Sequence, residues 1–212
     1  MNPVDTVLQA SFPTVMVPSR ESVAQMVRPG ERLLVAADGV YLEVLRPWLR
    51  VVRCLALWNV ATAVPYGKVV EATELLCPPV PPSLLADFRS QARRACPDET
   101  GAWVIWDAVT RLFRLVELEA TSRGPGHLVY QRPDLRDGEH CVVDCHSHGT
   151  GGAYFSRTDN DDDRHDVKFA FVLGHCDGER TSTALRLCIN GRFEKFDQLP
   201  QAWTAALDAA VR

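Results

Sequence analysis

The first third of the chain is a succession of short hydrophobic runs separated by polar turns. Runs at Thr14–Val17, Arg32–Ala36 and Val40–Val44 have the length and the β-branched composition of strands. An Asp-Gly pair lies between the last two runs and suits a tight hairpin turn. The strongly apolar segment Trp48–Trp58 is predicted to form a further strand. This pattern predicts a β-rich unit.

A proline cluster interrupts the pattern at residues 78–82, where four of the five residues are proline. Such a segment cannot lie inside a helix or a central strand, so we expect a stiff, extended linker. It divides the chain into a smaller β-rich N-terminal domain, residues 1–77, and a second domain, residues 83–212. All six histidines lie in the second domain, and docking to a partner is the role that we expect for the first.

A helix is predicted directly after the prolines. Ser83 is expected to cap it. The apolar residues Leu84, Leu85, Phe88 and Ala92 share one face at helical spacing, and the arginines among them fall on other faces. The helix should end before the Cys-Pro pair that follows, because the residue before a proline disfavours helical backbone.

The remainder of the second domain alternates strand-like and helical patterns. Thr121–Glu139 is rich in glycine, proline and charge and is predicted to be a loop or an insertion. Gln201–Val211 has the pattern of a closing amphipathic helix. The predicted strands are Ala102–Trp106, Leu112–Leu118, Cys141–His146, Val167–Leu173 and Leu185–Ile189. This order of elements predicts a mixed α/β fold.

Composition excludes several classes of protein. Hydrophobic residues make up 46% of the 212 residues and charged residues 24%, which is typical of a folded globular chain. The net charge of −4 gives no general attraction to nucleic acid. No apolar run reaches the roughly 18 residues that a membrane span needs. The first twenty residues lack the features of a signal peptide, so we expect a cytoplasmic protein.

The cysteines are expected to be thiols packed in the protein interior. There are seven of them, and no Cys-x-x-Cys pair exists, which excludes zinc ribbons and thioredoxin-type motifs. Cys141 and Cys145 precede a pair of histidines. From strand alternation we expect both thiols to face away from those histidines.

The informative residues are two histidines and an aspartate. His146 and His148 are two positions apart on a predicted strand, so their side chains point to the same side and can meet one ion. A glycine-rich loop follows and can return Asp159 to that ion as the third ligand. Two imidazoles and one carboxylate suit one Zn²⁺ per chain, with a fourth position left for water, as in catalytic zinc sites.

Hydrolysis at such a site also needs a general base and an oxyanion donor. Glu99 lies between a predicted helix and a predicted strand, where it can project into a cleft, and is our candidate base. Glu117 and Glu119 are rival bases that occupy or end an apolar strand. Ser156 could donate a hydrogen bond to the oxyanion that forms at an attacked carbonyl.

These residues resemble the motif of the JAMM (MPN+) zinc metalloproteases, the family of the prokaryotic JAB domains. The motif is His-x-His, seven residues, Ser, two residues and Asp, found here as His146, His148, Ser156 and Asp159. Its upstream glutamate matches Glu99 within a loose Pro-x-Glu-x-Gly. The resemblance implies a JAB/MPN-like (cytidine-deaminase-like) β-sheet flanked by helices. It also implies zinc-dependent cleavage of the peptide or isopeptide bond after the tail of a ubiquitin-like protein.

One residue departs from the family pattern, and the layout adds a narrower resemblance. Gly149 follows the second histidine where the family usually has proline, which predicts a looser loop. A β-rich N-terminal part, a proline connection and a JAB-type domain together are similar to the PRTRC system protein A family. That similarity implies two partners from the same operon, a ubiquitin-like protein as substrate and a ThiF-type activating enzyme.

Other interpretations stay open at this point. RadC-type proteins, which are linked to DNA metabolism, share the histidine, serine and aspartate pattern, and a non-catalytic MPN-type scaffold is a further alternative. Ser156-x-x-Asp159 is also an ordinary helix start, which is compatible with metal binding. The acidic run at residues 159–163 could suggest calcium, but it lacks the glycine and the final glutamate of an EF-hand loop.

Overall fold

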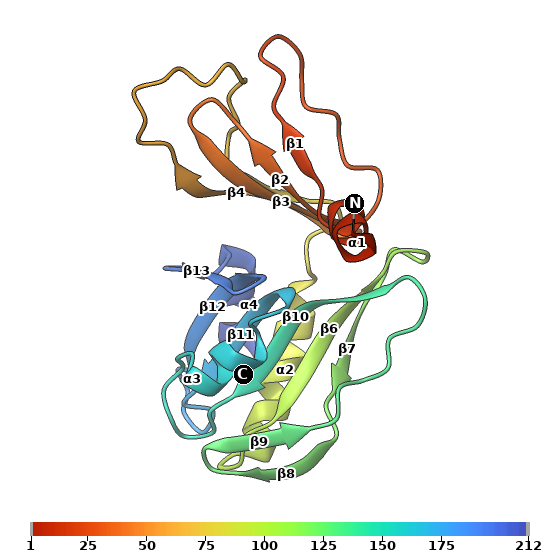
Figure 1. Ribbon diagram of the computed structural model, residues 1–212. Coiled ribbons are helices and arrows are strands. Elements are labelled where there is room, and N and C mark those ends of the chain that lie inside the picture. The colour runs from red at the N-terminus through yellow and green to blue at the C-terminus, as the bar shows by residue number, and fades with distance from the viewer. Residues whose placement is uncertain (1, 211–212) are drawn as a thin grey trace. The chain divides into compact units, whose positions relative to one another are not determined.

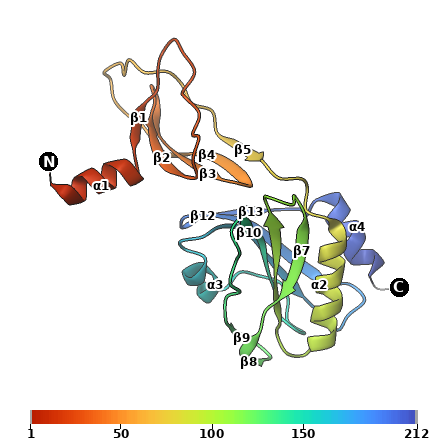
Figure 2. The ribbon, with the colours of Figure 1, turned by 90° about the vertical axis from the view of Figure 1, so that its right-hand side faces the viewer.

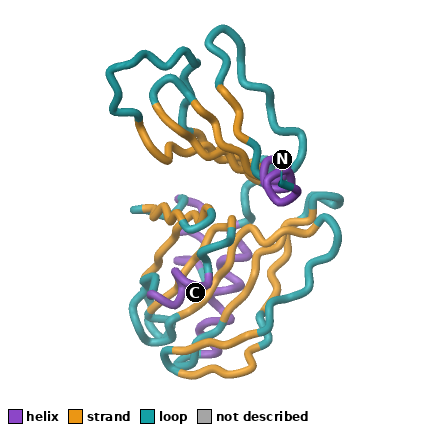
Figure 3. Tube along the Cα trace, in the orientation of Figure 1, coloured by secondary structure: helices purple, strands orange, loops and turns teal. Residues whose placement is uncertain are grey.

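The computed structural model describes residues 2–210 and divides after Pro78 into two compact units (Figure 1). Each unit carries its own sheet, as the strand colouring of Figure 3 shows. No helix among residues 2–210 is long and apolar enough to cross a membrane.

The first unit is the β-rich part. Its sheet has the order β1-β2-β3-β4-β5. The strands are β1 (Thr14–Met16), β2 (Gly30–Val35), β3 (Gly39–Arg46), β4 (Leu49–Leu57) and β5 (Ala72–Leu75). The predicted hairpin is confirmed, since β2 and β3 pair antiparallel across the Asp-Gly turn. A short helix, α1 (Pro3–Ser11), precedes the sheet and was not predicted; none of its residues is buried, so no apolar face against a core marks it.

The second unit is built on a six-stranded sheet of order β13-β12-β11-β10-β6-β7. The strands β10 and β11 run parallel, and the other neighbours pair antiparallel. Its strands are β6 (Gly101–Asp107), β7 (Phe113–Glu117), β10 (Glu139–Ser147), β11 (Val167–Gly174), β12 (Ser182–Ile189) and β13 (Arg192–Phe196). Its helices are α2 (Pro82–Ala95), α3 (Arg157–Asp162) and α4 (Gln201–Ala209). This arrangement confirms the predicted mixed α/β fold with a helix-flanked sheet.

The helices α2 and α4 cover one face of this sheet, and α3 lies on the other (Figure 2). The ring of Phe171 on β11 packs edge-on against Phe88 of α2 and Trp203 of α4, with centroids 6.3 and 6.2 Å apart. Leu85 and Phe88 are fully buried in this layer. Burial of these large apolar side chains is the main force that holds α2 to the sheet.

Two details of α2 differ from the prediction. The N-cap is Pro81 rather than Ser83, and no side chain caps the helix, because the prolines already fix the backbone entering it. Arg89, expected away from the apolar face, is 3% exposed. Its guanidinium donates to the backbone carbonyls of Leu207 and Glu179, which supply the hydrogen bonds that a buried charge requires.

The segment predicted as a loop or insertion contains secondary structure. It forms a separate two-stranded sheet of β8 (Ala120–Gly124) and β9 (His127–Tyr130). A short turn of Pro125 and Gly126 joins the strands. The prediction holds for residues 131–138 but missed this hairpin, because composition rich in glycine and charge hid two strands of only four or five residues. Val211, the predicted end of the last helix, lies outside the described residues.

Cys141 lies on the opposite face from the one predicted. The strand β10 has a register shift directly after Cys141, and an extra residue in a strand reverses the alternation of everything before it. Cys141 therefore packs against the hydrophobic cluster that contains Trp103. Trp103 pairs with Asp144, whose side chain lies on the same face of the sheet as His146. Cys145 is fully buried, as expected of a packed thiol.

Candidate metal centre

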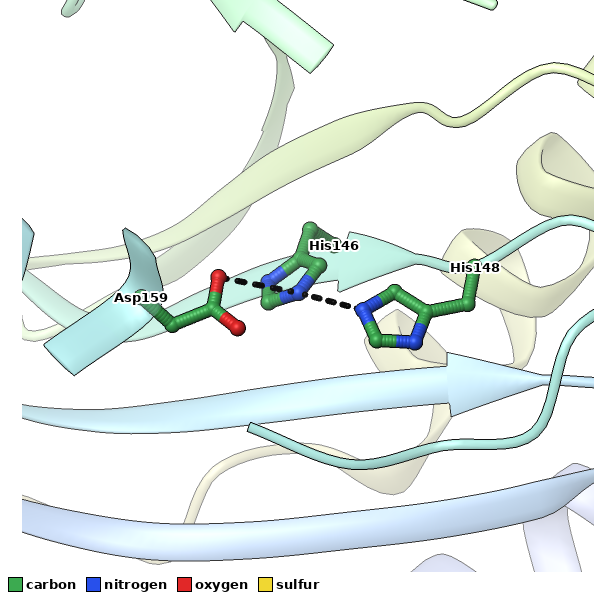
Figure 4. Close-up of side chains that lie close together, drawn as sticks. All are labelled: His146, His148 and Asp159. Carbon is green, nitrogen blue, oxygen red and sulfur yellow. Dashed lines mark hydrogen bonds and ion pairs between the residues drawn. The ribbon is translucent and has the colours of Figure 1, made fainter. Parts of the chain in front are cut away.

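Three side chains from three consecutive segments converge at the end of β10 (Figure 4). His146 lies on β10, His148 follows the last residue of that strand, and Asp159 lies in the first turn of α3. The Nε2 atoms of the two histidines are 3.2 Å apart, and His146 Nε2 is 3.5 Å from Asp159 Oδ1. One donor atom from each of the three lies within 4.8 Å of the others. The structure thus brings together the three residues predicted as metal ligands.

The backbone fixes the orientation of His148. Its Nδ1 lies 2.9 Å from the carbonyl oxygen of Gly152 and can only donate there. The protonated Nδ1 leaves the lone pair of Nε2 directed at His146 and Asp159, as in metal sites whose histidine is held by a carbonyl. The His148 amide donates to Leu173 O on β11 at 2.8 Å. The ring and the main chain are therefore both held.

The carboxylate of Asp159 is oriented by a capping box. Ser156 caps α3, and its Oγ accepts a hydrogen bond from the Asp159 amide at 3.1 Å. In return, Asp159 Oδ2 accepts from the Ser156 amide. One carboxylate oxygen is thus engaged, and Oδ1 is left to face His146. The motif can therefore start a helix and supply a metal ligand at the same time.

The protonation states match those of metal ligands. Burial lowers the pKa of His146, although Asp159 opposes the shift, so the ring is neutral at pH 7. Burial acts to raise the pKa of Asp159, but His146 and the hydrogen bonds of Ser156 outweigh it and hold the pKa below its usual value. Metal ions bind neutral imidazole and ionised carboxylate. These two groups are already in those forms, so a metal ion does not have to displace protons from them.

The donor set fits zinc. Two imidazole nitrogens and one carboxylate oxygen are the ligands of many catalytic zinc sites. With metal–ligand distances of about 2.0–2.1 Å, tetrahedral geometry places neighbouring donors about 3.3 Å apart. The observed separations of 3.2 and 3.5 Å lie on either side of that value. The described chain supplies three ligands here, so a fourth ligand would come from substrate or solvent.

The metal-binding group opens into a cavity of about 580 Å³ that Glu99 and Ser156 also line. The backbone of Glu99 is held by a hydrogen bond from its amide to Gly124 O, at 3.2 Å. Burial raises the pKa of the Glu99 carboxyl; His148 opposes this shift and Asp159 adds to it. A raised pKa is typical of a carboxyl group that exchanges protons near neutral pH. The rivals Glu117 and Glu119 do not line this cavity.

Comparison with known proteins identifies the family of the second unit. A model described as prokaryotic homologs of the JAB domain matches residues 81–188, slightly more than half of the chain. The chain belongs to the prokaryotic JAB family. A second model, a domain of unknown function named DUF2016, matches residues 2–76. The JAB family includes metal-dependent hydrolases, and the resemblance drawn from the sequence motif is confirmed at the level of the family.

Comparison with individual proteins gives one weak structural similarity. No curated protein matches the chain. Among solved structures, the solution structure of protein DSY2949 from Desulfitobacterium hafniense is similar, with 15% sequence identity and a TM-score of 0.42. The match covers 53% of this chain and 85% of that one.

Several side chains that line the JAB cavity were not predicted from the sequence, among them His127, Tyr154 and Asp144. The Tyr154 ring stands edge-on to His148 with centroids 4.6 Å apart. The positions of His127 and Tyr154 in the sequence have no regular spacing from the ligands that would have indicated a role. Asp144 could have been found, because it precedes His146 by two positions on the same strand face. Its carboxylate is paired with Lys168, at 2.7 Å, and it is not one of the three metal-ligand candidates.

Gly149 does not loosen the JAB loop, and the prediction that it would is wrong. Its φ of +53° lies in the region that favours glycine, and a Cβ there would stand 2.1 Å from Pro97 O. Its carbonyl accepts from the Cys176 amide at 2.8 Å. A proline cannot adopt this φ. The position is thus tightly packed between the turn that precedes Glu99 and the end of β11.

Gly149→Ala should therefore destabilise the JAB domain. We expect its unfolding free energy to fall by about 2–3 kcal/mol, from backbone strain together with the collision with Pro97. The matched control is Gly126→Ala, since Gly126 also has positive φ, +97°, but nothing within 4 Å of an added Cβ. Urea unfolding of the two variants measures the difference. Equal losses would show that the close packing at Gly149 has no energetic weight.

Proposed function

We propose that this chain is a zinc-dependent peptidase or isopeptidase that cleaves the bond after the C-terminal tail of a ubiquitin-like protein in a bacterial ubiquitin-like pathway. The observation that carries the proposal is the convergence of His146, His148 and Asp159 at one wall of a cavity that also holds Glu99 and Ser156. Family membership supports hydrolysis in general, and the choice of tail rests on the motif resemblance.

Each residue has a separate task in this reaction. Zinc held by the three ligands would supply Lewis acidity and so activate water near neutral pH. Glu99 accepts a proton from the attacking water and delivers it to the departing amine. Ser156 Oγ accepts from the Asp159 amide, so its own hydroxyl proton is available to the oxygen that gains negative charge at the attacked carbonyl.

The cavity wall suits an extended peptide. The strand β9 contributes Leu128, Val129 and Tyr130 to the lining, which also includes Tyr154. Along β9 the only partner strand in the described chain is β8, so main-chain groups of its other edge can pair with an added strand. A narrow, extended tail fits such an edge better than a globular surface does.

Two protein partners are proposed for this reaction. The ubiquitin-like protein is the substrate, and a ThiF-type activating enzyme of the same operon would prepare it, as the similarity to the PRTRC system protein A family implies. A cytoplasmic site for the reaction is consistent with such a pathway. The first unit, residues 2–78, is available for docking either partner.

The test is cleavage of a ubiquitin-like protein that carries a short C-terminal extension. The zinc-loaded full chain is incubated with this fusion, and intact-mass spectrometry identifies the cut. A single cut at the end of the tail, abolished by a chelator and restored by zinc, is expected. Zinc binding without any cleavage of tail fusions or isopeptide-linked conjugates would refute the proposed substrate and favour a scaffold.

A further inference from the structure

The third ligand is carried by a helix that has almost no apolar anchorage. The helix α3 has six residues, and none of them is buried. It follows a loop with glycines at positions 149, 151 and 152. Burial of apolar side chains, which usually fixes a helix on a sheet, is thus missing here. The position of Asp159 must be determined by polar contacts.

Arg186 on β12 supplies most of those contacts. Its side chain is 1% exposed, and its guanidinium donates to the backbone carbonyl of Asp159 at 3.0 Å, to Asn160 Oδ1 and to Asp163 Oδ2 at 2.6 Å. One side chain therefore bonds the ligand's own peptide group, the next residue of the helix and the C-cap. A planar fork with several donors can do this, whereas a lysine ammonium cannot.

The guanidinium is itself held on both faces. Its Cζ lies 4.0 Å from the ring centroid of Phe155 and 4.1 Å from that of Phe193. Stacking between two aromatic rings fixes the plane of the fork and excludes water from it. Phe155 directly precedes the Ser156 cap, so the same sandwich holds the start of α3.

A second cation completes the attachment of the helix end. Lys168 on β11 is buried, and its Nζ lies 2.8 Å from Asp163 Oδ1 and 2.7 Å from Asp144 Oδ2. Asp163, the C-cap of α3, is therefore shared between Lys168 and Arg186. Of these two cations, Arg186 bonds the peptide group of Asp159, whereas Lys168 contacts the C-cap Asp163.

We propose that Arg186 is a positioning residue for the metal centre, which fixes α3 so that Asp159 Oδ1 faces the Nε2 atoms of His146 and His148. The inference rests on the metal centre of the proposed function and not on its substrate. Arg186 touches neither metal nor substrate. Its loss should reduce the zinc affinity of the site, because Asp159 is then no longer held in place.

The test is the zinc dissociation constant of the full chain, measured by competition with a chromophoric chelator. Arg186→Met and Arg186→Lys are expected to weaken zinc binding about 10- to 100-fold, as for other residues that orient a metal ligand. Leu85→Ala is the control, because it destabilises the core through α2 without touching α3. It should leave the zinc affinity within about two-fold of wild type.

The following outcomes would contradict the inference or limit it. A folded Arg186→Met that binds zinc as tightly as wild type, or a Leu85→Ala that weakens binding equally, would overturn the inference. If Arg186→Met does not fold, Asn160→Ala removes one of the acceptors and should still weaken zinc binding relative to Leu85→Ala. A wild type that binds no zinc overturns this inference together with the metal centre. A wild type that binds zinc but cleaves no tail refutes only the proposed substrate.

Discussion

His148→Ala is expected to reduce bound zinc from about one ion per chain to almost none. The substitution removes one of the three donor atoms that lie within 4.8 Å of one another, and the two that remain cannot hold zinc against the competition of solvent. It also frees the Gly152 carbonyl that His148 Nδ1 bonds. Elemental analysis of freshly purified protein measures the ion content, before and after incubation with zinc.

The matched control is His165→Ala. His165 is exposed and lies outside the cavity that holds the ligands, so its loss changes the histidine content but not the site. It should retain zinc at the level of the wild type. Zinc content that falls equally in both variants would show adventitious binding to surface histidines. A wild type that binds no zinc after reconstitution would refute the metallohydrolase interpretation.

The chemistry of the site was easier to predict than the elements that hold it. His146 and His148 could be paired because alternation along a strand is a strict local rule. Asp159 followed from the motif and from the return of a flexible loop. Glu99 is separated from the histidines by β6, β7 and the β8–β9 hairpin. Its place between a predicted helix and a predicted strand made it a candidate base, and the family motif connected it to the histidines.

The errors have particular physical causes. The register shift in β10 reversed the face of Cys141, and a bulge leaves no clear sign in a single sequence. The prediction for Gly149 failed because Pro97, its neighbour across the fold, lies far away in the chain. Charge is also a poor guide to burial in this chain. Arg89 and Arg186 are both buried, and the terminal guanidinium nitrogens of each bond groups that are distant in the sequence.

Glu99→Gln is expected to lower kcat for tail cleavage by about 10²- to 10⁴-fold while zinc content stays that of the wild type. The amide has the shape of the carboxyl group but cannot take up the proton that general-base catalysis requires. The hydrogen bond from the residue 99 main-chain amide to Gly124 O involves only the backbone and should persist. Steady-state rates on the tail fusion, with zinc measured on the same samples, separate loss of the base from loss of the metal.

The control is the same chemical change at a rival base, Glu117→Gln. Glu117 ends β7 and does not line the cavity, so this variant should cleave within about two-fold of the wild-type rate. If Glu117→Gln loses activity and Glu99→Gln keeps it, the assignment of the base is wrong. If Glu99→Gln loses zinc as well as activity, the carboxyl group contributes to holding the metal rather than to proton transfer alone.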